Sequence, residues 1–186
     1  MDIQRVCDYI IRVEGAGKTL TVLKLQRLLY FAQGWHLAFY GDPFFEGRFQ
    51  AWAQGPINRK IYDRFAGRPL DSEVTAADVS KDFDVTSLSQ QESNHIHSVL
   101  EAYERCEDTS FNEIINKDAP WLEARSRCLE HCQREVEEDN MRRFCVVQYL
   151  LKQFGTKGGL SAKPQTYPFL AVLGEACEWT QALIPV

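Results

Sequence analysis

Residues 24–37 read KLQRLLYFAQGWHL, and the chain continues as AFYGDP through residue 43. Apolar side chains in this segment recur at steps of three and four residues, which is the spacing of one face of an α-helix. The stripe consists of Leu25, Leu28, Leu29, Ala32, His36 and Phe39. It extends over about five helical turns and ends at Gly41-Asp42-Pro43. The segment therefore predicts a long helix with one buried face, capped at its start by Thr19 or Thr21.

Helical patterns also occur before and after this segment. Residues 2–13 carry apolar side chains at near-helical spacing, and Gly15 and Gly17 end that helix. Ser89 with Glu92 fits a capping box, and so does Ser110 with Glu113, so we expect a helix to begin at each serine.

Two further helices are expected towards the C-terminus. Asp118-Ala119-Pro120 predicts the start of a long helical stretch from Trp121 towards Gln153, with a break near Asn140. The glycine-rich residues 155–166 have the composition of a linker. Beyond this segment, Thr166 and Pro168 can start a last amphipathic helix.

The β signal is confined to a short part of the chain. Residues 44–53, FFEGRFQAWA, alternate aromatic and polar groups around Glu46-Gly47, which predicts a short hairpin or two brief strands. Pro56 is suited to the first turn of a helix that runs to Phe65. Residues 70–87 are acidic and predict a surface loop with at most a short strand. The fold class that follows is mainly α (α+β): a compact helical domain with a small antiparallel β element and a C-terminal helical extension.

Composition narrows the class of protein. The 186 residues are 45% hydrophobic and 25% charged, which is typical of one globular domain, alone or with an appendage. No apolar run approaches the roughly 18 residues that would span a bilayer, and the start of the chain lacks the features of an export signal. We therefore expect a cytoplasmic protein whose six cysteines are reduced thiols, mostly in the core.

The charge is unevenly distributed. The net charge is -5 overall; residues 1–140 have 16 Lys and Arg against 24 Asp and Glu, and residues 141–186 have 5 against 2. The acidic body makes nucleic-acid binding improbable, because such binding needs clustered Lys and Arg. It favours a basic protein partner instead.

No motif in the sequence indicates catalysis. Residues 15–19, GAGKT, resemble the end of a phosphate-binding loop, but position 12 is Arg where that loop needs Gly. Cys128, His131 and Cys132 are close enough to share a metal, yet no second ligand pair is evident, so core cysteines are the better interpretation. His95 and His97 read as surface and edge residues, and His36 as a hydrogen-bonded core histidine. We expect no enzymatic activity, no cofactor and no metal.

One combination of motifs is more informative. KLQRLLYFAQGWHL is followed by Tyr40-Gly41, Pro43 and Phe45, then by AWAQGP at residues 51–56, Tyr62, and Pro120-Trp121. This combination resembles the Panacea domain, the SocA-like antitoxin domain of many bacterial and phage toxin–antitoxin pairs. The family pattern runs KLQKLLYYAQGWHLA, then an AW-x-x-GP turn, and later Pro-Trp. The resemblance covers about residues 2–127.

The resemblance has departures and implications. Ile57 replaces the usual valine after Gly-Pro, and the His that usually precedes Pro-Trp is missing. The resemblance implies a helical domain that neutralises a toxin by binding it. It also divides the chain into an antitoxin domain (1–127), a helical extension (128–154), a linker (155–166) and a C-terminal amphipathic tail (167–186). The matched residues read as scaffold: Lys24, Leu25, Gln26, Leu28, Leu29, Tyr30, Gly34, Trp35, His36, Trp52, Gly55, Pro56, Tyr62, Pro120 and Trp121. Within this set, Gly34 is expected to permit close helix approach.

The sequence-based hypothesis is an antitoxin that binds and occludes its cognate toxin. Several alternatives remain open: a proteolytic adaptor that engages a protease, a phage counter-defence protein on the same scaffold, or a small enzyme that reverses a toxin's modification. Homo-oligomers are also compatible with the sequence. The candidate partner-binding residues lie in the basic tail region and are Tyr167, Phe169, Val172, Leu173, Trp179, Arg142 and Arg143. The alternative for the tail helix is that it folds back on its own domain.

Overall fold

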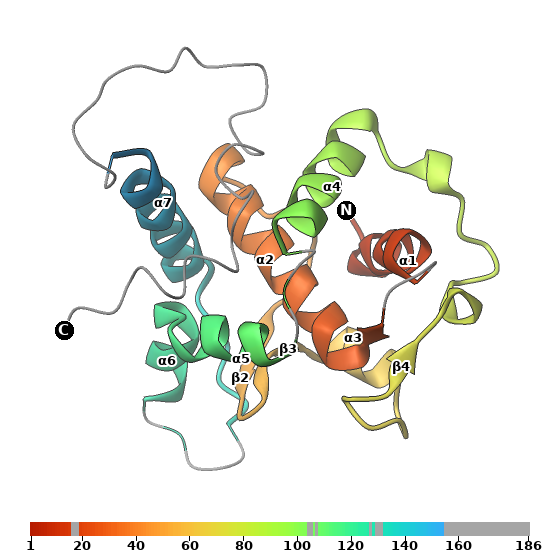
Figure 1. Cartoon of the computed structure of the whole chain (residues 1–186), viewed down its shortest axis with the longest axis horizontal. Helices are drawn as coiled ribbons and strands as arrows, with labels where there is room; N and C mark the ends of the chain where they lie inside the picture. Colours follow the sequence, from red (N-terminus) through yellow and green to blue (C-terminus); the bar gives the residue numbers. More distant parts are fainter. Residues whose placement is uncertain (16–18, 104–105, 107, 127, 129–131, 155–186) are drawn as a thin grey trace.

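The computed structural model describes residues 1–15, 19–103, 106, 108–126, 128 and 132–154. Within these residues, seven α-helices and two small antiparallel sheets form the fold, as Figure 1 shows. The expectation of a mainly α domain with a small antiparallel β element is confirmed. No helix in this part of the chain is long and apolar enough to cross a membrane.

The helices and strands alternate along the first half of the chain. The helices are α1 (Ile3–Glu14), α2 (Val22–Tyr40), α3 (Arg59–Arg64), α4 (Gln90–Tyr103), α5 (Asp108–Asn116), α6 (Ala119–Arg125) and α7 (Glu138–Phe154). The strands are β1 (Leu20–Thr21), β2 (Phe49–Trp52), β3 (Gly55–Asn58) and β4 (Glu73–Val74). β1 pairs with β4, and β2 pairs with β3, each in antiparallel register.

Helix α2 lies at the centre of the molecule. Thr21 caps it through a hydrogen bond from Lys24 N to Thr21 Oγ1 of 3.0 Å, and Gly41 ends it with φ of 84°. The chain reverses there because glycine adopts this left-handed conformation without steric cost. Figure 1 shows α7 on one side of α2 and α4 with α1 on the other. Helix α2 therefore buries nearly its whole circumference rather than one stripe.

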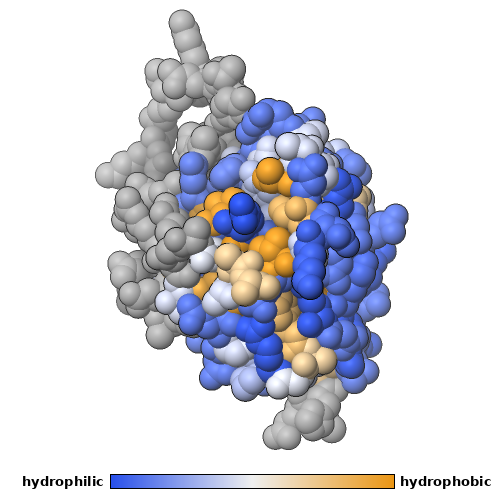
Figure 2. All heavy atoms as spheres, turned by 90° about the vertical axis from the view of Figure 1, so that its right-hand side faces the viewer, coloured by the Kyte–Doolittle hydropathy of each residue, from blue (hydrophilic) through white to orange (hydrophobic). Residues whose placement is uncertain are grey.

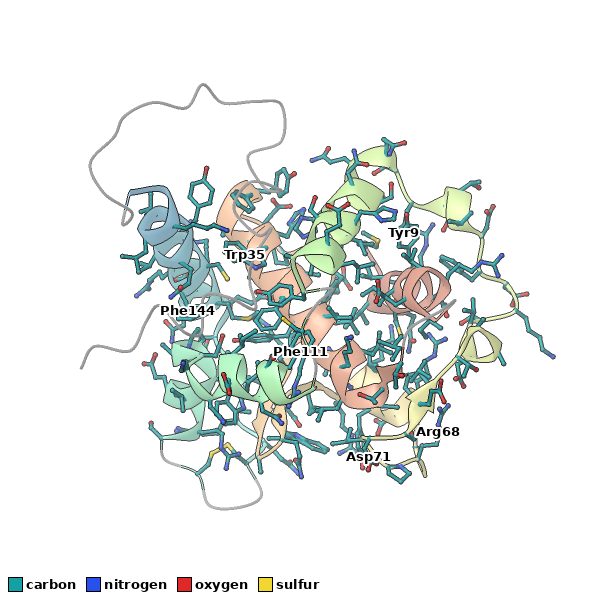
Figure 3. The ribbon with its side chains drawn as sticks, viewed as in Figure 1. Tyr9, Trp35, Arg68, Asp71, Phe111 and Phe144 are labelled. Carbon is teal, nitrogen blue, oxygen red and sulfur yellow. A yellow bond between two sulfur atoms is a disulfide. The ribbon has the colours of Figure 1, made fainter. Side chains whose placement is uncertain are left out.

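An aromatic stack joins α2 to α4 and α5. Phe31 of α2 stacks on Tyr103 of α4, with ring centroids 4.3 Å apart. Phe111 of α5, labelled in Figure 3, stacks on Tyr103 at 5.7 Å. Offset stacking of buried rings adds about 0.5–1.5 kcal/mol per pair beyond the area that the rings bury. This stack ties α4 and α5 to the central helix.

Several expected boundaries are wrong. The hairpin turns at Ala53-Gln54 instead of Glu46-Gly47, because residues 49–52 pair with residues 55–58. Pro56 lies in β3, and α3 begins at Arg59 because the Asn58 side chain accepts a hydrogen bond from Ile61 N. Helix α5 begins at Asp108, so Ser110 lies inside it. The box at Ser89 and Glu92 does open a helix, α4, with both reciprocal hydrogen bonds present.

The helical stretch expected from Trp121 to Gln153, with a break near Asn140, is wrong in its middle part. Helix α6 ends at Arg125 and α7 begins at Glu138. Between them, residues 134–136 lie along the edge of β2: Ala51 N donates to Arg134 O at 2.8 Å, and Val136 N donates to Phe49 O at 2.7 Å. These bonds satisfy backbone groups of β2 that a helix at this position would leave unpaired. The predicted linker and tail, residues 155–186, lie outside the described residues.

Candidate functional site

Three polar side chains on one face of α2 are buried, two of them before the AQGW segment (residues 32–35) and one inside it. Gln26, Tyr30 and Gln33 follow each other at steps of four and three residues. Gln26 binds the backbone of Asn58 twice: its Oε1 accepts from Asn58 N at 2.9 Å, and its Nε2 donates to Asn58 O at 3.2 Å. This pair of bonds ties the end of β3 to α2.

Gln33 and Tyr30 hold two other segments in the same way. The Oε1 of Gln33 accepts from Phe44 N and Phe45 N, at 3.0 and 3.2 Å. Tyr30 donates to Asp118 Oδ1 at 2.8 Å, and the same oxygen caps α6 by accepting from Trp121 N at 2.9 Å. These side chains position the segments that surround α2. Sequence analysis missed these links, although polar side chains at helical spacing inside a largely apolar helix are a signal for them.

The turn between β2 and β3 is held from the side of α6. The indole of Trp121 donates to Trp52 O at 3.1 Å, and Arg125 donates to Ala51 O at 2.8 Å. Gly55 completes the turn with φ of 133°, a value that favours glycine. The Pro-Trp signature thus acts at the AWAQGP turn, far away in sequence.

This turn forms one wall of a groove of about 600 Å³. The groove, called here the Trp52–Tyr62 groove, lies between the hairpin turn, α3, the segment that follows α3, and the end of α6. Its lining includes Trp52, Arg59, Tyr62, Arg68, Leu70, Arg125 and Cys132. The rings of Trp52 and Tyr62 are 4.8 Å apart and both are half-buried. The groove thus brings together two aromatic residues of the family pattern that are ten positions apart in sequence.

Three arginines line the groove, and two of them pair with carboxylates outside its lining. Arg59 pairs with Asp63 at 2.9 Å and lies over the Tyr62 ring at 5.4 Å, with 55% of its side chain exposed. Arg68 pairs with Asp78 at 2.7 Å, and Arg125 lies over the Trp121 ring at 5.4 Å. Among the described residues, no carboxylate lines the groove. The arrangement is suited to binding an anionic group next to an apolar one.

A disulfide lies at the edge of the groove. Cys128 and Cys132 are bonded, and Figure 3 shows the link as a yellow bond at the lower left. The expectation that all cysteines are reduced is therefore wrong for this pair. That expectation rested on the lack of an export signal, whereas the two Cα atoms lie 5.3 Å apart, within the range of a disulfide. Cys7 and Cys145 are buried free thiols.

A second, smaller pocket of about 300 Å³ contains His36 and His95. The expectation that His95 is a surface or edge residue is wrong: it is buried and its Nε2 lies 2.9 Å from Ala32 O. Burial lowers the pKa of His95 to about 4 and also lowers the pKa of His36. His36 is hydrogen-bonded to Asp42 O but half-buried rather than in the core, with its ring 4.5 Å from Tyr40 and 4.8 Å from Phe44.

Most of the scaffold residues that sequence analysis named are buried, in three elements. Lys24, Leu25, Gln26, Leu28, Leu29, Tyr30, Gly34 and Trp35 are buried on α2, Gly55 and Pro56 are buried in β3, and Pro120 and Trp121 are buried at the start of α6. Only Trp52 and Tyr62 of this set line the groove, and His36 lines the smaller pocket.

The expected partner-binding residues do not reach the groove in the described part of the chain. Arg142 and Arg143 are exposed on α7, where both lie near Asp139. Val147, Leu150 and Leu151 on the same helix are also exposed. Tyr167, Phe169, Val172, Leu173 and Trp179 lie outside the described residues.

The fold and the groove define a small, mainly helical domain. The family model of the SocA-like antitoxin, Panacea domain, matches residues 25–122. The chain therefore belongs to the SocA-like antitoxin family of Panacea domains. No curated protein and no solved structure gave a significant match to the chain. The matched span contains α2, the β2–β3 hairpin, α3 and the start of α6, and hence most of the groove.

Proposed function

We propose that this chain is the antitoxin of a toxin–antitoxin pair, and that it neutralises its toxin stoichiometrically in the cytoplasm by binding and occluding it. Membership of an antitoxin family supports the general role. The observation that carries the direct-binding mechanism is the Trp52–Tyr62 groove. Trp, Tyr and Arg are the residues most enriched at the energetic centres of protein interfaces, and all three types meet here.

The groove has the properties of a preformed interface centre. Trp121 and Arg125 hold the backbone of the turn, so the two rings need little ordering when a partner binds. Both rings keep part of their surface exposed, and a partner side chain can bury that surface. Burial of one aromatic ring at an interface centre contributes about 2 kcal/mol or more.

Co-expression with the toxin encoded beside this chain tests the proposal. We expect growth rescue, and a stable complex of constant stoichiometry on size-exclusion chromatography. The double variant Trp52→Ala/Tyr62→Ala should lose both. Tyr40→Ala is the matched control, because Tyr40 is an exposed aromatic residue on another surface. Both variants are checked for native helicity by circular dichroism.

Other results would point to the alternatives. Rescue by far less antitoxin than toxin would show catalysis, and a shortened toxin half-life that needs a protease would show an adaptor. Rescue that survives the double variant but fails with Tyr40→Ala would place the interface elsewhere. Any of these results would contradict occlusion through the groove.

A further inference from the structure

We propose that the Trp52–Tyr62 groove binds an acidic segment of the partner protein, with carboxylates at the arginines and an apolar side chain at the rings. This inference rests on the proposed function, because it names the chemistry of the partner at the same site. It differs from the expectation drawn from net charge, which favoured a basic partner.

Basic side chains line this groove, although the whole chain is acidic. The chain carries a net charge of -5, yet Arg59, Arg68 and Arg125 converge on one groove whose lining contains no carboxylate among the described residues. Charges at a binding site act over about a Debye length of 8–10 Å, so the groups next to the groove decide which group it attracts. Asp63 and Asp78 pair with Arg59 and Arg68, whereas the Arg125 guanidinium is held by the neutral carbonyl of Ala51 and keeps its positive charge. The attracted group is an anion.

The guanidinium groups come from three elements and are already positioned. Arg59 is on α3, Arg68 follows α3, and Arg125 ends α6. Asp63 holds Arg59, Asp78 holds Arg68, and the carbonyl of Ala51 holds Arg125. Because these contacts limit the side-chain rotamers in the free protein, binding costs less conformational entropy. Arg is also the side chain whose planar group best matches a carboxylate.

The spacing of charge and ring selects a peptide over a simple anion. Trp52 and Tyr62 present adjoining ring surfaces, and Leu70 adds an aliphatic group to the same lining. A groove of about 600 Å³ accommodates several side chains of an extended segment. An alternation of Asp or Glu with one aromatic or aliphatic residue fits this lining.

The surroundings disfavour a nucleic acid. A phosphate backbone carries charge at every nucleotide and requires a continuous positive track. Carboxylates border the arginines instead: Asp63 pairs with Arg59, and Asp78 pairs with Arg68. A long polyanion would run past more of these carboxylates than a short acidic segment confined to the groove.

Selection of random linear peptides displayed on phage, against the full chain, tests the proposal without the toxin. We expect enrichment of Asp and Glu around one apolar residue, and binding of the synthetic peptides that weakens as salt increases. In Arg59→Glu the affinity of these peptides should fall by about tenfold or more. Arg48→Glu is the matched control, since Arg48 also pairs with a carboxylate, that of Glu138, at 2.9 Å, is about as exposed as Arg59 and is not among the residues that line the groove; it should change affinity less than about twofold.

Each other outcome overturns the proposal. The selection could yield no peptide, or peptides without enrichment of Asp and Glu. The two variants could lose the same amount of peptide affinity. Oligothymidylate at low concentration could displace the peptides, which would indicate a nucleic-acid site. Failure of the proposed function is separate: acidic peptides that bind the groove while the co-expressed toxin does not would leave this inference standing and reject the toxin as its partner.

Discussion

Gly34 of α2 lies directly against Cys145 of α7: a Cβ atom on residue 34 would come within 3.1 Å of Cys145 Sγ. The Met141 side chain of α7 is 3.7 Å from the same position. The prediction that Gly34 permits close helix approach is thus confirmed, and the partner is α7. The glycine of the AQGW segment is a packing residue because any side chain there would push the two helices apart.

Gly34→Val should lower the free energy of unfolding by about 1–3 kcal/mol, because the added methyl groups overpack the α2–α7 contact. Urea denaturation of the full chain measures this change. The control is the double variant Gly34→Val/Cys145→Ala, in which removal of the sulfur should recover part of the loss. Strict additivity of the two substitutions would contradict the contact.

Gln33→Leu should destabilise the fold by about 2–5 kcal/mol, because it leaves the buried N–H groups of Phe44 and Phe45 without their acceptor. The matched control is Gln91→Leu, at an exposed position on α4, which should change stability by less than about 0.5 kcal/mol. Thermal and urea denaturation give both values. Equal effects of the two substitutions would show that the Gln33 amide is not a structural link.

Asp118 should make the fold less stable as pH rises. Burial raises the pKa of Asp118 to about 6, against the effect of the hydrogen bonds from Trp121 N and Tyr30. The folded state therefore holds this proton at pH values where the unfolded chain releases it. The stabilising contribution is complete below the unfolded pKa of 3.8 and is lost as pH rises through about 6.

The stability difference between the wild type and Asp118→Asn measures this contribution. It should fall by on the order of 2–3 kcal/mol between about pH 4 and pH 7. Asp78→Asn should show the opposite trend. Hydrogen bonds from Thr75 N and Arg68 outweigh the effect of partial burial there and hold the pKa of Asp78 below its usual value. A flat Asp118 difference would contradict the buried carboxyl.

His95 should make the fold sensitive to acid. Burial lowers the pKa of His95 to about 4, so the unfolded chain binds a proton on this residue more readily than the folded state. Its contribution to stability is present above pH 6.5 and is lost as pH falls towards about 4, by on the order of 3 kcal/mol. Titration of the imidazole signals by NMR, assigned with His95→Gln, measures the pKa. A value near 6.5 would contradict the buried neutral ring.

The Cys128–Cys132 disulfide should protect Cys128 from alkylation until a reductant is added. Cys128 is half-buried and should then react in the native protein, whereas Cys7 and Cys145 are buried and should stay unlabelled. Burial also raises the pKa of the Cys7 thiol to about 12, which keeps it protonated. Mass spectrometry after iodoacetamide treatment reads out each site. Labelling of Cys128 without reductant would show that the bond is absent.

Loss of this disulfide should have a small effect on global stability. Its loop is short, so replacement of both cysteines by Ser should cost about 2 kcal/mol or less. Urea denaturation of Cys128→Ser/Cys132→Ser measures this cost. A larger loss would mean that the groove wall around Cys132 supports the rest of the fold.

Local sequence patterns predicted the elements whose causes are local. The stripe from Leu25 to Phe39, the Thr21 cap and the Gly41 stop each act within a few residues, and α2 forms where they indicate. The capping box at Ser89 likewise opens α4. The family pattern could also be identified from sequence, because its residues keep fixed spacings.

Only the tertiary structure decided which distant groups meet. Gln26 binds Asn58, Tyr30 binds Asp118, and the segment of residues 132–136 pairs with β2 where a helix was expected. Unpaired strand edges and buried amides need hydrogen-bond partners, and the fold supplies these partners from distant parts of the sequence. The groove follows the same rule. Arg59 and Arg125 are far apart in sequence, so their spacing did not indicate that they line one groove. Net charge is a sum over the whole chain, so composition did not indicate an arginine-lined groove on an acidic protein.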